Sequence, residues 1–183
     1  MRILGLSGSL RRDSHNGRLL LGAAGLLGED AELVLFEDLA AIPPFNEDDE
    51  HPAPPAVDAL KRAIAGADAV LVATPEYNGS LPGVLKNALD WASRPPAGSP
   101  LKGKPVAVIG ASTGLFGAVW AQAETRKVLA TIGARVVDRE LPVGQAGQAL
   151  GEDGLPLDDD TRAALSATLD ELLELAGPAR IAA

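Results

Sequence analysis

Short apolar runs alternate with longer segments of helical periodicity along most of this chain. Five runs have the length and composition of strands: Arg2–Leu6, Glu32–Phe36, Ala69–Ala73, Pro105–Ile109 and Ala134–Arg139. Each is bounded by Gly, Pro, Asp or Ser, residues that are typical of turns. The third run is apolar at every position, as expected for a strand of a parallel sheet that is covered on both faces. The pattern therefore predicts an α/β chain with a five-stranded parallel sheet.

The segments between these runs have the pattern of helices. Leu19–Leu27 is rich in Leu and Ala, and a further helix is expected over roughly Ala118–Ile132. Another is expected to begin near Ser80 and Pro82, because Ser can cap free amides and Pro is tolerated in a first helical turn. Two more helices are marked by apolar faces, formed by Val57, Leu60 and Ile64 and by Leu165, Leu169, Leu172, Leu173 and Ala176.

Two long loops interrupt this alternation. Ile42–Pro55 contains five prolines and an acidic run, and Gln145–Asp160 precedes the last helix. Loops of this length serve as lids or contact surfaces in some proteins, but a plain solvated loop is the interpretation we favour. No internal repeat and no linker is evident, so residues 1–183 are expected to form a single domain.

Composition narrows the possible functions. With 183 residues, of which 46% are hydrophobic, the chain can fill one sizeable core. Its formal charge of −9 has the wrong sign for holding nucleic acid or an anionic membrane surface, and only 3% of its residues are aromatic. The absence of cysteine excludes disulfides, thiolate catalysis and thiolate-bound metals. The first apolar run is too short for a signal peptide or a membrane span, so we expect a cytoplasmic protein.

Ligands of open α/β sheets bind beyond the carboxyl ends of the strands. Three loops should therefore carry the chemistry: Ser7–Asn16, Thr74–Pro82 and Gly110–Gly117.

The first loop leads directly into a helix and combines hydroxyl groups with Arg11. Free amides at a helix start, together with a cation, favour a phosphate group. The loop has neither the Walker lysine nor the Gly-x-Gly-x-x-Gly dinucleotide fingerprint. An open alternative is that Ser14 or Asn16 only caps the helix.

The second loop combines Pro75, Tyr77 and a Gly-bounded turn. Tyr77 could pack on a planar ring, with the backbone amides of Glu76 to Asn78 facing the polar edge of that ring. A turn followed by a helix cap is the alternative interpretation.

Together these loops resemble a known family. The segments Gly8-Ser9-Leu10-Arg11, with Ser14 and Asn16, Thr74 to Ser80, and Pro82 to Trp91 resemble the NADPH-dependent FMN reductase family of the flavodoxin-like superfamily. The resemblance covers about residues 1 to 140 and fades over Gln145–Ala183. It implies a flavodoxin-like three-layer sandwich with FMN as cofactor and NADPH or NADH as co-substrate.

The resemblance also implies the residues of the cofactor site. It implies that Ser9, Arg11, Ser14 and Asn16 hold the FMN phosphate, that Pro75, Glu76, Tyr77 and Asn78 line the isoalloxazine ring, and that Ser112, Thr113 and Gly114 close its other side. The chemistry is then carried by the flavin, without a catalytic acid, base or metal from the protein.

Other polar residues have less specific interpretations. Lys86, Asn87, Asp90 and Trp91 fall on the predicted third helix and are interpreted as scaffold or subunit contacts. The histidines, His15 and His51, lie in separate loops; His15 could approach the phosphate, although solvent exposure is the expected outcome. The acidic run Asp48–Glu50 is expected to be solvated and not to bind a metal.

The expected activity is hydride transfer from NAD(P)H to FMN and then to a quinone, an azo compound, a metal oxyanion or free flavin. Arg12 and Arg94 are candidates for contacting a nucleotide 2′-phosphate. Because a slot in an open sheet is shallow, a second subunit is expected to provide its other wall, in a homodimer or homotetramer. A flavodoxin-type electron carrier is the alternative function, and a hydrolase or phosphotransferase that uses the first loop is a further one.

Overall fold

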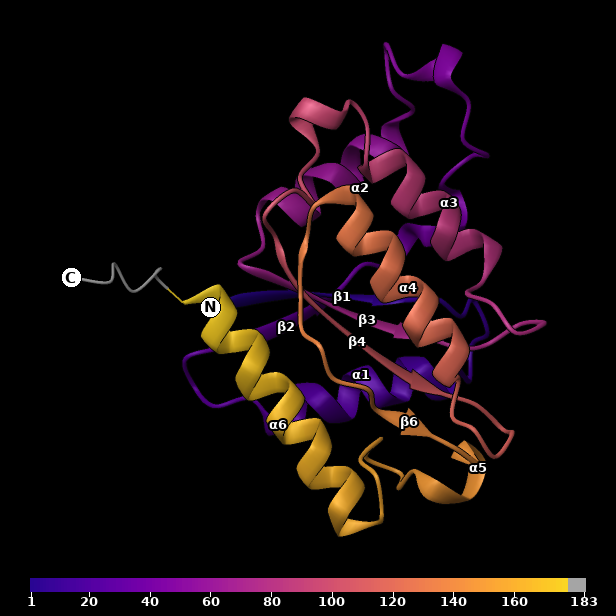
Figure 1. Cartoon of the computed structure of the whole chain (residues 1–183), viewed down its shortest axis with the longest axis vertical. Coiled ribbons are helices and arrows are strands. Elements are labelled where there is room, and N and C mark those ends of the chain that lie inside the picture. Colours follow the sequence, from indigo (N-terminus) through magenta and orange to yellow (C-terminus); the bar gives the residue numbers. More distant parts are fainter. Residues whose placement is uncertain (178–183) are drawn as a thin grey trace.

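The computed structural model describes residues 1–177, which form a twisted parallel sheet between two layers of helices (Figure 1). The strands are β1 (Arg2–Ser7), β2 (Glu32–Leu35), β3 (Ala69–Thr74), β4 (Pro105–Ala111), β5 (Arg135–Val136) and β6 (Pro142–Val143). Their order in the sheet is β2-β1-β3-β4-β5, and β6 also pairs with β4. This is the flavodoxin-like arrangement that was expected.

Helices cover both faces of the sheet. Helices α1 (His15–Leu26) and α6 (Asp159–Ala176) pack on one face, and α2 (Pro55–Ala65), α3 (Gly83–Ala92) and α4 (Val119–Ile132) pack on the other (Figure 1). A short helix, α5 (Ala146–Ala149), and three 3-10 turns lie in the connections. Two apolar cores result, one on each face, and every residue of β3 and β4 is buried between them. This double coverage explains why these two strands lack polar alternation.

The fifth strand departs from its prediction. The run Ala134–Arg139 pairs with β4 only at β5, and the chain returns to β4 as β6, beside Gly110 and Ala111. Between them the backbone of Leu141 bonds with the buried side chain of Gln122, which donates to its carbonyl and accepts from its amide. The apolar pattern predicted the position of the strand correctly, but after it the chain is held at Leu141 by the Gln122 side chain together with one backbone bond from the Gly110 amide.

The helix starts differ from the predictions in one instructive case. Helix α3 begins at Gly83, with Pro82 before it and no side-chain cap. The hydroxyl of Ser80 instead donates to Glu124 Oε2 at 2.6 Å, so the predicted Ser80 cap is wrong. Helix α4 begins one residue after the prediction, and α1 begins earlier, at His15.

The loop Ile42–Pro55 is anchored to α3. Asn87 accepts from the Phe45 amide, and both Asn87 Nδ2 and Trp91 Nε1 donate to the carbonyl of Pro43 at 2.8 Å. Trp91 is fully buried and lies edge-to-face with Phe45. The scaffold role predicted for Asn87 and Trp91 is therefore confirmed.

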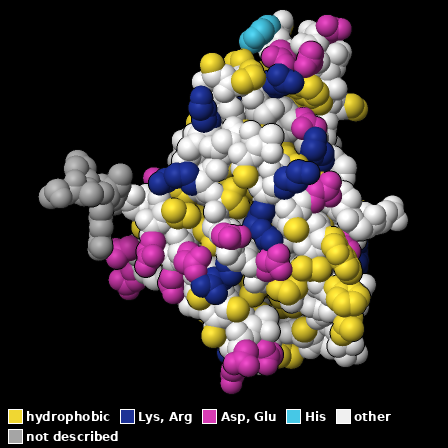
Figure 2. All heavy atoms as spheres, viewed as in Figure 1, with side chains coloured by type: hydrophobic (Ala, Val, Ile, Leu, Met, Phe, Trp, Pro, Cys, Tyr) yellow, Lys and Arg dark blue, Asp and Glu magenta, His cyan; other side chains and the backbone are white. Residues whose placement is uncertain are grey.

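The surface carries mixed charge. Lys and Arg side chains alternate with Asp and Glu on the face shown in Figure 2 and form no basic patch there. The acidic turn Glu47–Asp49 is exposed, as expected, and Arg94 pairs with Glu47 at 3.1 Å and with Glu50 at 3.9 Å. Within residues 1–177, no helix is both long enough and apolar enough to cross a membrane.

Candidate functional site

A cavity of about 120 Å³ lies at the carboxyl edge of the sheet, where the three predicted loops meet. Its lining includes most of the predicted site: Ser9, Arg11, Ser14, Asn16, Pro75, Glu76, Tyr77, Ser112 and Thr113. Asn78 and Gly114 were also predicted for the site but do not line this cavity. Ala111 lines it without having been predicted to do so, and His15 lines it although solvent exposure was the outcome favoured for it. Residues far apart in the sequence are thus brought to one edge by the parallel topology.

The wall formed by the first loop contains hydrogen-bond donors that have no acceptor in the part of the chain that the structure describes. Ser14 caps α1 by accepting from the Gly17 amide at 3.2 Å, while the amides of the first helical turn have no acceptor within the helix. Ser9 Oγ accepts from the Arg11 amide at 3.4 Å. The guanidinium of Arg11 is exposed and forms no ion pair with any residue in the described range. A cation and a helix start therefore face the same cavity, an arrangement that favours an anion.

Asn16 joins this helix start to the central strand β4. Its Nδ2 donates to the Ala111 carbonyl and its Oδ1 accepts from the Ala111 amide, both at 2.9 Å. The side chain is almost fully buried. Both polar atoms of the amide are thus used within the protein, and Asn16 holds α1 at a fixed position against the third loop.

His15 is half-buried, whereas solvent exposure was expected for it. Its Nδ1 is buried and has no hydrogen-bond partner among the residues described. Burial lowers the pKa of His15 below its usual 6.5, and the nearby charges of Arg18 and Arg11 lower it further. The neutral ring therefore lines the cavity beside the cation Arg11. The sequence signal was its place between Ser14 and Asn16 at the helix start.

The second loop is a tight turn. Tyr77 and Ser80 exchange backbone hydrogen bonds, and the two residues between them, Asn78 and Gly79, have φ values of 55° and 77°. Positive φ at both central positions defines a type I′ turn, for which Asn-Gly is the preferred pair. Because the Tyr77 amide donates to Ser80, it is not one of the amides available to face a ring.

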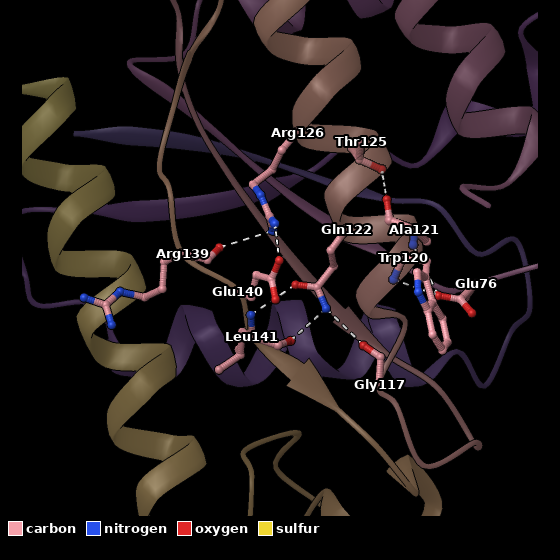
Figure 3. A network of polar contacts seen from close by, with 10 residues as sticks. All are labelled: Glu76, Gly117, Trp120, Ala121, Gln122, Thr125, Arg126, Arg139, Glu140 and Leu141. Atoms are coloured by element: carbon pink, nitrogen blue, oxygen red, sulfur yellow. Dashed lines mark hydrogen bonds and ion pairs between the residues drawn. The ribbon is translucent and has the colours of Figure 1, made fainter. Parts of the chain in front are cut away.

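Two carboxylates tie this loop to α4. Oε2 of Glu76 accepts from the amides of Trp120 and Ala121 at 3.1 and 3.2 Å, and so caps the helix start (Figure 3). Oε2 of Glu124 accepts from the Ser80 hydroxyl and from the Leu81 amide. The side chain of Glu76, predicted to line a ring, thus directs its carboxylate toward α4.

Gln122 anchors the end of the third loop to the strand region around Leu141 through side-chain hydrogen bonds. Its Nε2 donates to the carbonyls of Gly117 and Leu141, and its Oε1 accepts from the Leu141 amide (Figure 3). The side chain is completely buried. The sequence did not single out Gln122, because a Gln on a helix gives no sign of which backbone it will meet.

Exposed apolar side chains gather on the loop between β4 and α4 and at the start of α4, and Tyr77, which lines the cavity, is exposed as well. Tyr77 is 48% exposed, Trp120 53%, Phe116 60% and Leu115 70%. The rings of Phe116 and Trp120 lie edge-to-face with centroids 5.2 Å apart. Figure 2 shows hydrophobic side chains gathered over the loop between β4 and α4. In a chain with so few aromatic residues, this exposed group indicates a contact surface. The sequence signal was an aromatic pair four residues apart.

Comparisons with known proteins show the family of the chain. The family described as NADPH-dependent FMN reductase matches residues 1–148. An NAD(P)H-dependent FMN reductase of Pseudomonas aeruginosa is 42% identical over 174 residues, which are 94% of this chain and 93% of that protein. A 2-hydroxy-1,4-benzoquinone reductase of a Burkholderia species is 39% identical and covers 93% of each chain.

A solved structure gives the same result for the fold. FerB, a flavoenzyme NAD(P)H:(acceptor) oxidoreductase from Paracoccus denitrificans, superimposes with a TM-score of 0.84 at 37% identity and covers 96% of each chain. The similarity thus extends past residue 140, where the motif resemblance faded, into the last helix.

Proposed function

The chain belongs to the NADPH-dependent FMN reductase family and is an FMN-dependent NAD(P)H oxidoreductase, and on that premise we propose that it holds FMN in the cleft at the carboxyl edge of the sheet and reduces a quinone. The observation that carries this proposal is the meeting of three loops around one cavity, with unpaired donors at one end and exposed apolar side chains at the other. The names of the relatives from Burkholderia and Pseudomonas support the acceptor and the cofactor, respectively.

The phosphate of FMN is held by the first loop and the start of α1. The cavity there has about 120 Å³, enough for a phosphate group but too little for the flavin ring. Arg11 supplies the charge, and the loop and helix amides supply directed hydrogen bonds. Ser9 and Ser14 lie in the same wall, and His15 lines the cavity beside them. The donor set therefore fits a phosphate.

The flavin ring lies over the second and third loops. Pro75 and Tyr77 provide flat apolar surface, with Ser112 and Thr113 facing them across the cavity. Asn78 acts through the type I′ turn that sets the direction of Tyr77, and Gly114 acts through the course of the third loop. Asn16 and Glu76 position the loops, because their side chains bond to Ala111 and to α4.

FMN, when bound, supplies the two-electron chemistry by accepting a hydride from NAD(P)H and passing it to the acceptor. The protein then needs to bind, orient and shield the ring. Arg11 orients it through the phosphate, and Tyr77 and Pro75 cover one of its sides. No side chain of the chain is assigned a proton-transfer step.

A second copy of the chain covers the exposed apolar group near the cleft. Leu115, Phe116 and Trp120 together would be costly to leave in water, and they follow closely in the chain on Ser112 and Thr113, which line the cavity. We expect a homodimer, or a homotetramer built from it, in the cytoplasm, where NAD(P)H is available. The whole chain, residues 1–183, acts as one FMN-binding domain within it.

The visible spectrum of the purified protein tests the cofactor assignment. Flavin absorption bands are expected, and denaturation should release FMN. A protein that stays colourless after FMN is added, or that releases FAD, contradicts the assignment. A redox titration without a stable one-electron form further separates a reductase from an electron carrier.

Initial-rate kinetics tests the acceptor. With NAD(P)H varied at several concentrations of 1,4-benzoquinone, parallel double-reciprocal lines are expected, because both substrates use the same face of one flavin in turn. Intersecting lines would indicate that both substrates bind together.

Light scattering tests the dimer, by comparing the molecular mass of the double variant Phe116→Ser, Trp120→Ser with that of the unmodified chain.

A further inference from the structure

A second cavity, of about 400 Å³, lies on the other side of the first loop, next to β2. It shares Ser9, Arg11 and Ser14 with the phosphate cavity, so the two are separated only by the loop itself. Its other walls come from the segment that follows β2. The FMN site assigned above does not use this space.

The walls of this cavity combine apolar side chains with serine hydroxyls, two cations and one carboxylate. Leu10, Phe36 and Leu39 form apolar surface, while Glu37 and Arg12 stand at its border. Neither Arg12 nor Glu37 forms an ion pair within residues 1–177. Such a cavity suits a flat, mostly apolar ring that carries hydroxyl groups and a phosphate.

Arg94, the other candidate for contacting a nucleotide phosphate, already forms ion pairs within the protein. Arg94 pairs with Glu47 and Glu50, and its guanidinium lies 5.8 Å from the centre of the Phe45 ring. Arg12 lines the second cavity and does not line the phosphate cavity.

The position of Glu37 has a precedent in the general rules of α/β folds. In dinucleotide-binding β-α-β units, an acidic residue just after the second strand accepts hydrogen bonds from the ribose hydroxyls of adenosine. Here β1 and β2 pair in parallel, with Gly5 opposite Leu35, and Glu37 follows that strand. The arrangement exists without the glycine fingerprint, which is why the sequence did not predict it.

We propose that the second cavity binds an adenosine 5′-phosphate group, with adenine on Leu10, Phe36 and Leu39, the ribose hydroxyls on Glu37 and the phosphate on Arg12. Its volume falls within the range of small-molecule sites. Two dinucleotides carry this group, NAD(P)H and FAD. The proposal rests on the FMN assignment above, because the shared wall places the adenosine site next to the FMN phosphate.

Titration of FMN-loaded protein with AMP, followed by calorimetry, tests the site directly. One AMP should bind per chain without releasing FMN, which the flavin spectrum monitors. Arg12→Ala should weaken AMP roughly tenfold and leave adenosine unaffected, because a charged hydrogen bond is lost. Glu37→Ala should weaken both ligands. AMP that fails to bind, or that binds only by displacing FMN, overturns the proposal while the FMN assignment stands.

Matched controls lie at the opposite ends of the same strands. Arg2 and Glu32 are exposed and pair in register at the amino ends of β1 and β2. Arg2→Ala and Glu32→Ala make the same charge changes away from the cavity and should leave AMP binding unchanged. If they weaken AMP as much as Arg12→Ala and Glu37→Ala do, the effect is one of net charge and the site is refuted.

The source of the adenosine group is read from the same Arg12→Ala variant. If the group belongs to NAD(P)H, the KM for NADH should rise roughly tenfold at constant kcat, with the Kd for FMN unchanged. If it belongs to FAD, the affinity of FMN-free protein for FAD should fall while its affinity for FMN does not. A variant that alters neither dinucleotide contradicts the proposal.

Discussion

Two helices begin at the same edge of the sheet and are satisfied in opposite ways. At the start of α1, Ser14 accepts from one amide, and the guanidinium of Arg11 stands beside the remaining free donors. At the start of α4, Glu76 accepts from the amides of Trp120 and Ala121. A helix start carries partial positive charge. One start is therefore left for an incoming anion, whereas the other already holds a carboxylate of the protein.

This difference orients the ligand. A molecule with an anionic end and a flat, less charged end is stabilised with its anion at α1 and its ring toward α4. The reverse orientation would bring a phosphate close to the carboxylate of Glu76. The polarity of the cleft thus follows from one acidic side chain and one basic side chain on neighbouring loops.

The largest effect is expected for Asn16, which holds the α1 start against β4. Asn16→Ala leaves the amide and carbonyl of Ala111 without these partners, and a buried unsatisfied group costs roughly 1–3 kcal/mol. The free energy of unfolding, measured by urea titration, should fall by about 2–4 kcal/mol. Asn46→Ala, at an exposed turn, is the control and should cost about 1 kcal/mol or less. Equal losses in both variants would show that Asn16 is not a special anchor.

Arg11 comes next, because it supplies the charge at the open helix start. Arg11→Ala should weaken FMN binding by roughly 10- to 100-fold, since a hydrogen bond to a charged group contributes about 1.5–3 kcal/mol. Riboflavin, which lacks the phosphate, should bind the variant and the unmodified chain about equally.

The neighbouring Arg12 is the control for this prediction, because it does not line the phosphate cavity. Arg12→Ala should change FMN affinity much less than Arg11→Ala does. Unchanged FMN affinity in Arg11→Ala, or a parallel loss of riboflavin affinity, would mean that the phosphate assignment is wrong.

Variants of Glu76 test the start of α4, where this carboxylate accepts from the helix amides. Glu76→Ala should lower the free energy of unfolding by about 1 kcal/mol, as for a lost helix cap, and Glu76→Gln should cost less because its amide oxygen still accepts. Opening this start should also let inorganic phosphate stabilise Glu76→Ala more than the unmodified chain in thermal unfolding. If phosphate stabilises both equally, α4 does not compete for the anion.

The smallest effect is expected for the pH dependence of stability, through His15 at the start of α1. Burial, followed by Arg18 and Arg11, lowers the pKa of His15 in the folded protein. The unfolded chain then binds more protons below pH 6.5. In FMN-free protein, part of the free energy of unfolding depends on a neutral His15. This part should be fully present above pH 6.5 and be lost as the pH falls toward the folded-state pKa of His15.

Proton NMR can follow His15 directly, with His15→Asn to assign its resonance. Addition of FMN should raise the pKa of His15, because the phosphate brings negative charge to the cavity. Riboflavin should leave this pKa where it was. A pKa that rises equally with both ligands would place the phosphate away from His15.

The periodicity of the chain determined most of the fold. Continuous apolar runs marked β3 and β4 because strands buried on both faces admit no polar alternation. The spacing of Val57, Leu60 and Ile64 marked α2, because those three side chains are the ones buried. Local chemistry also marked the first two site loops, since Arg11 with Ser14 and Asn78 with Gly79 have preferences that act over a few residues.

Tertiary structure decided what the polar side chains do. Ser80, expected to cap α3, instead donates to Glu124, and Glu76 in the second loop caps a different helix, α4. Asn16 reaches Ala111 across 95 positions of sequence. Such pairings depend on which backbone groups are left unsatisfied when distant elements meet, and buried polar groups must find a partner there. The sequence by itself therefore determined the sheet, the helices, the edge where the loops converge and the first loop as the place for an anion. Only packing decided that the start of α4 already holds the carboxylate of Glu76.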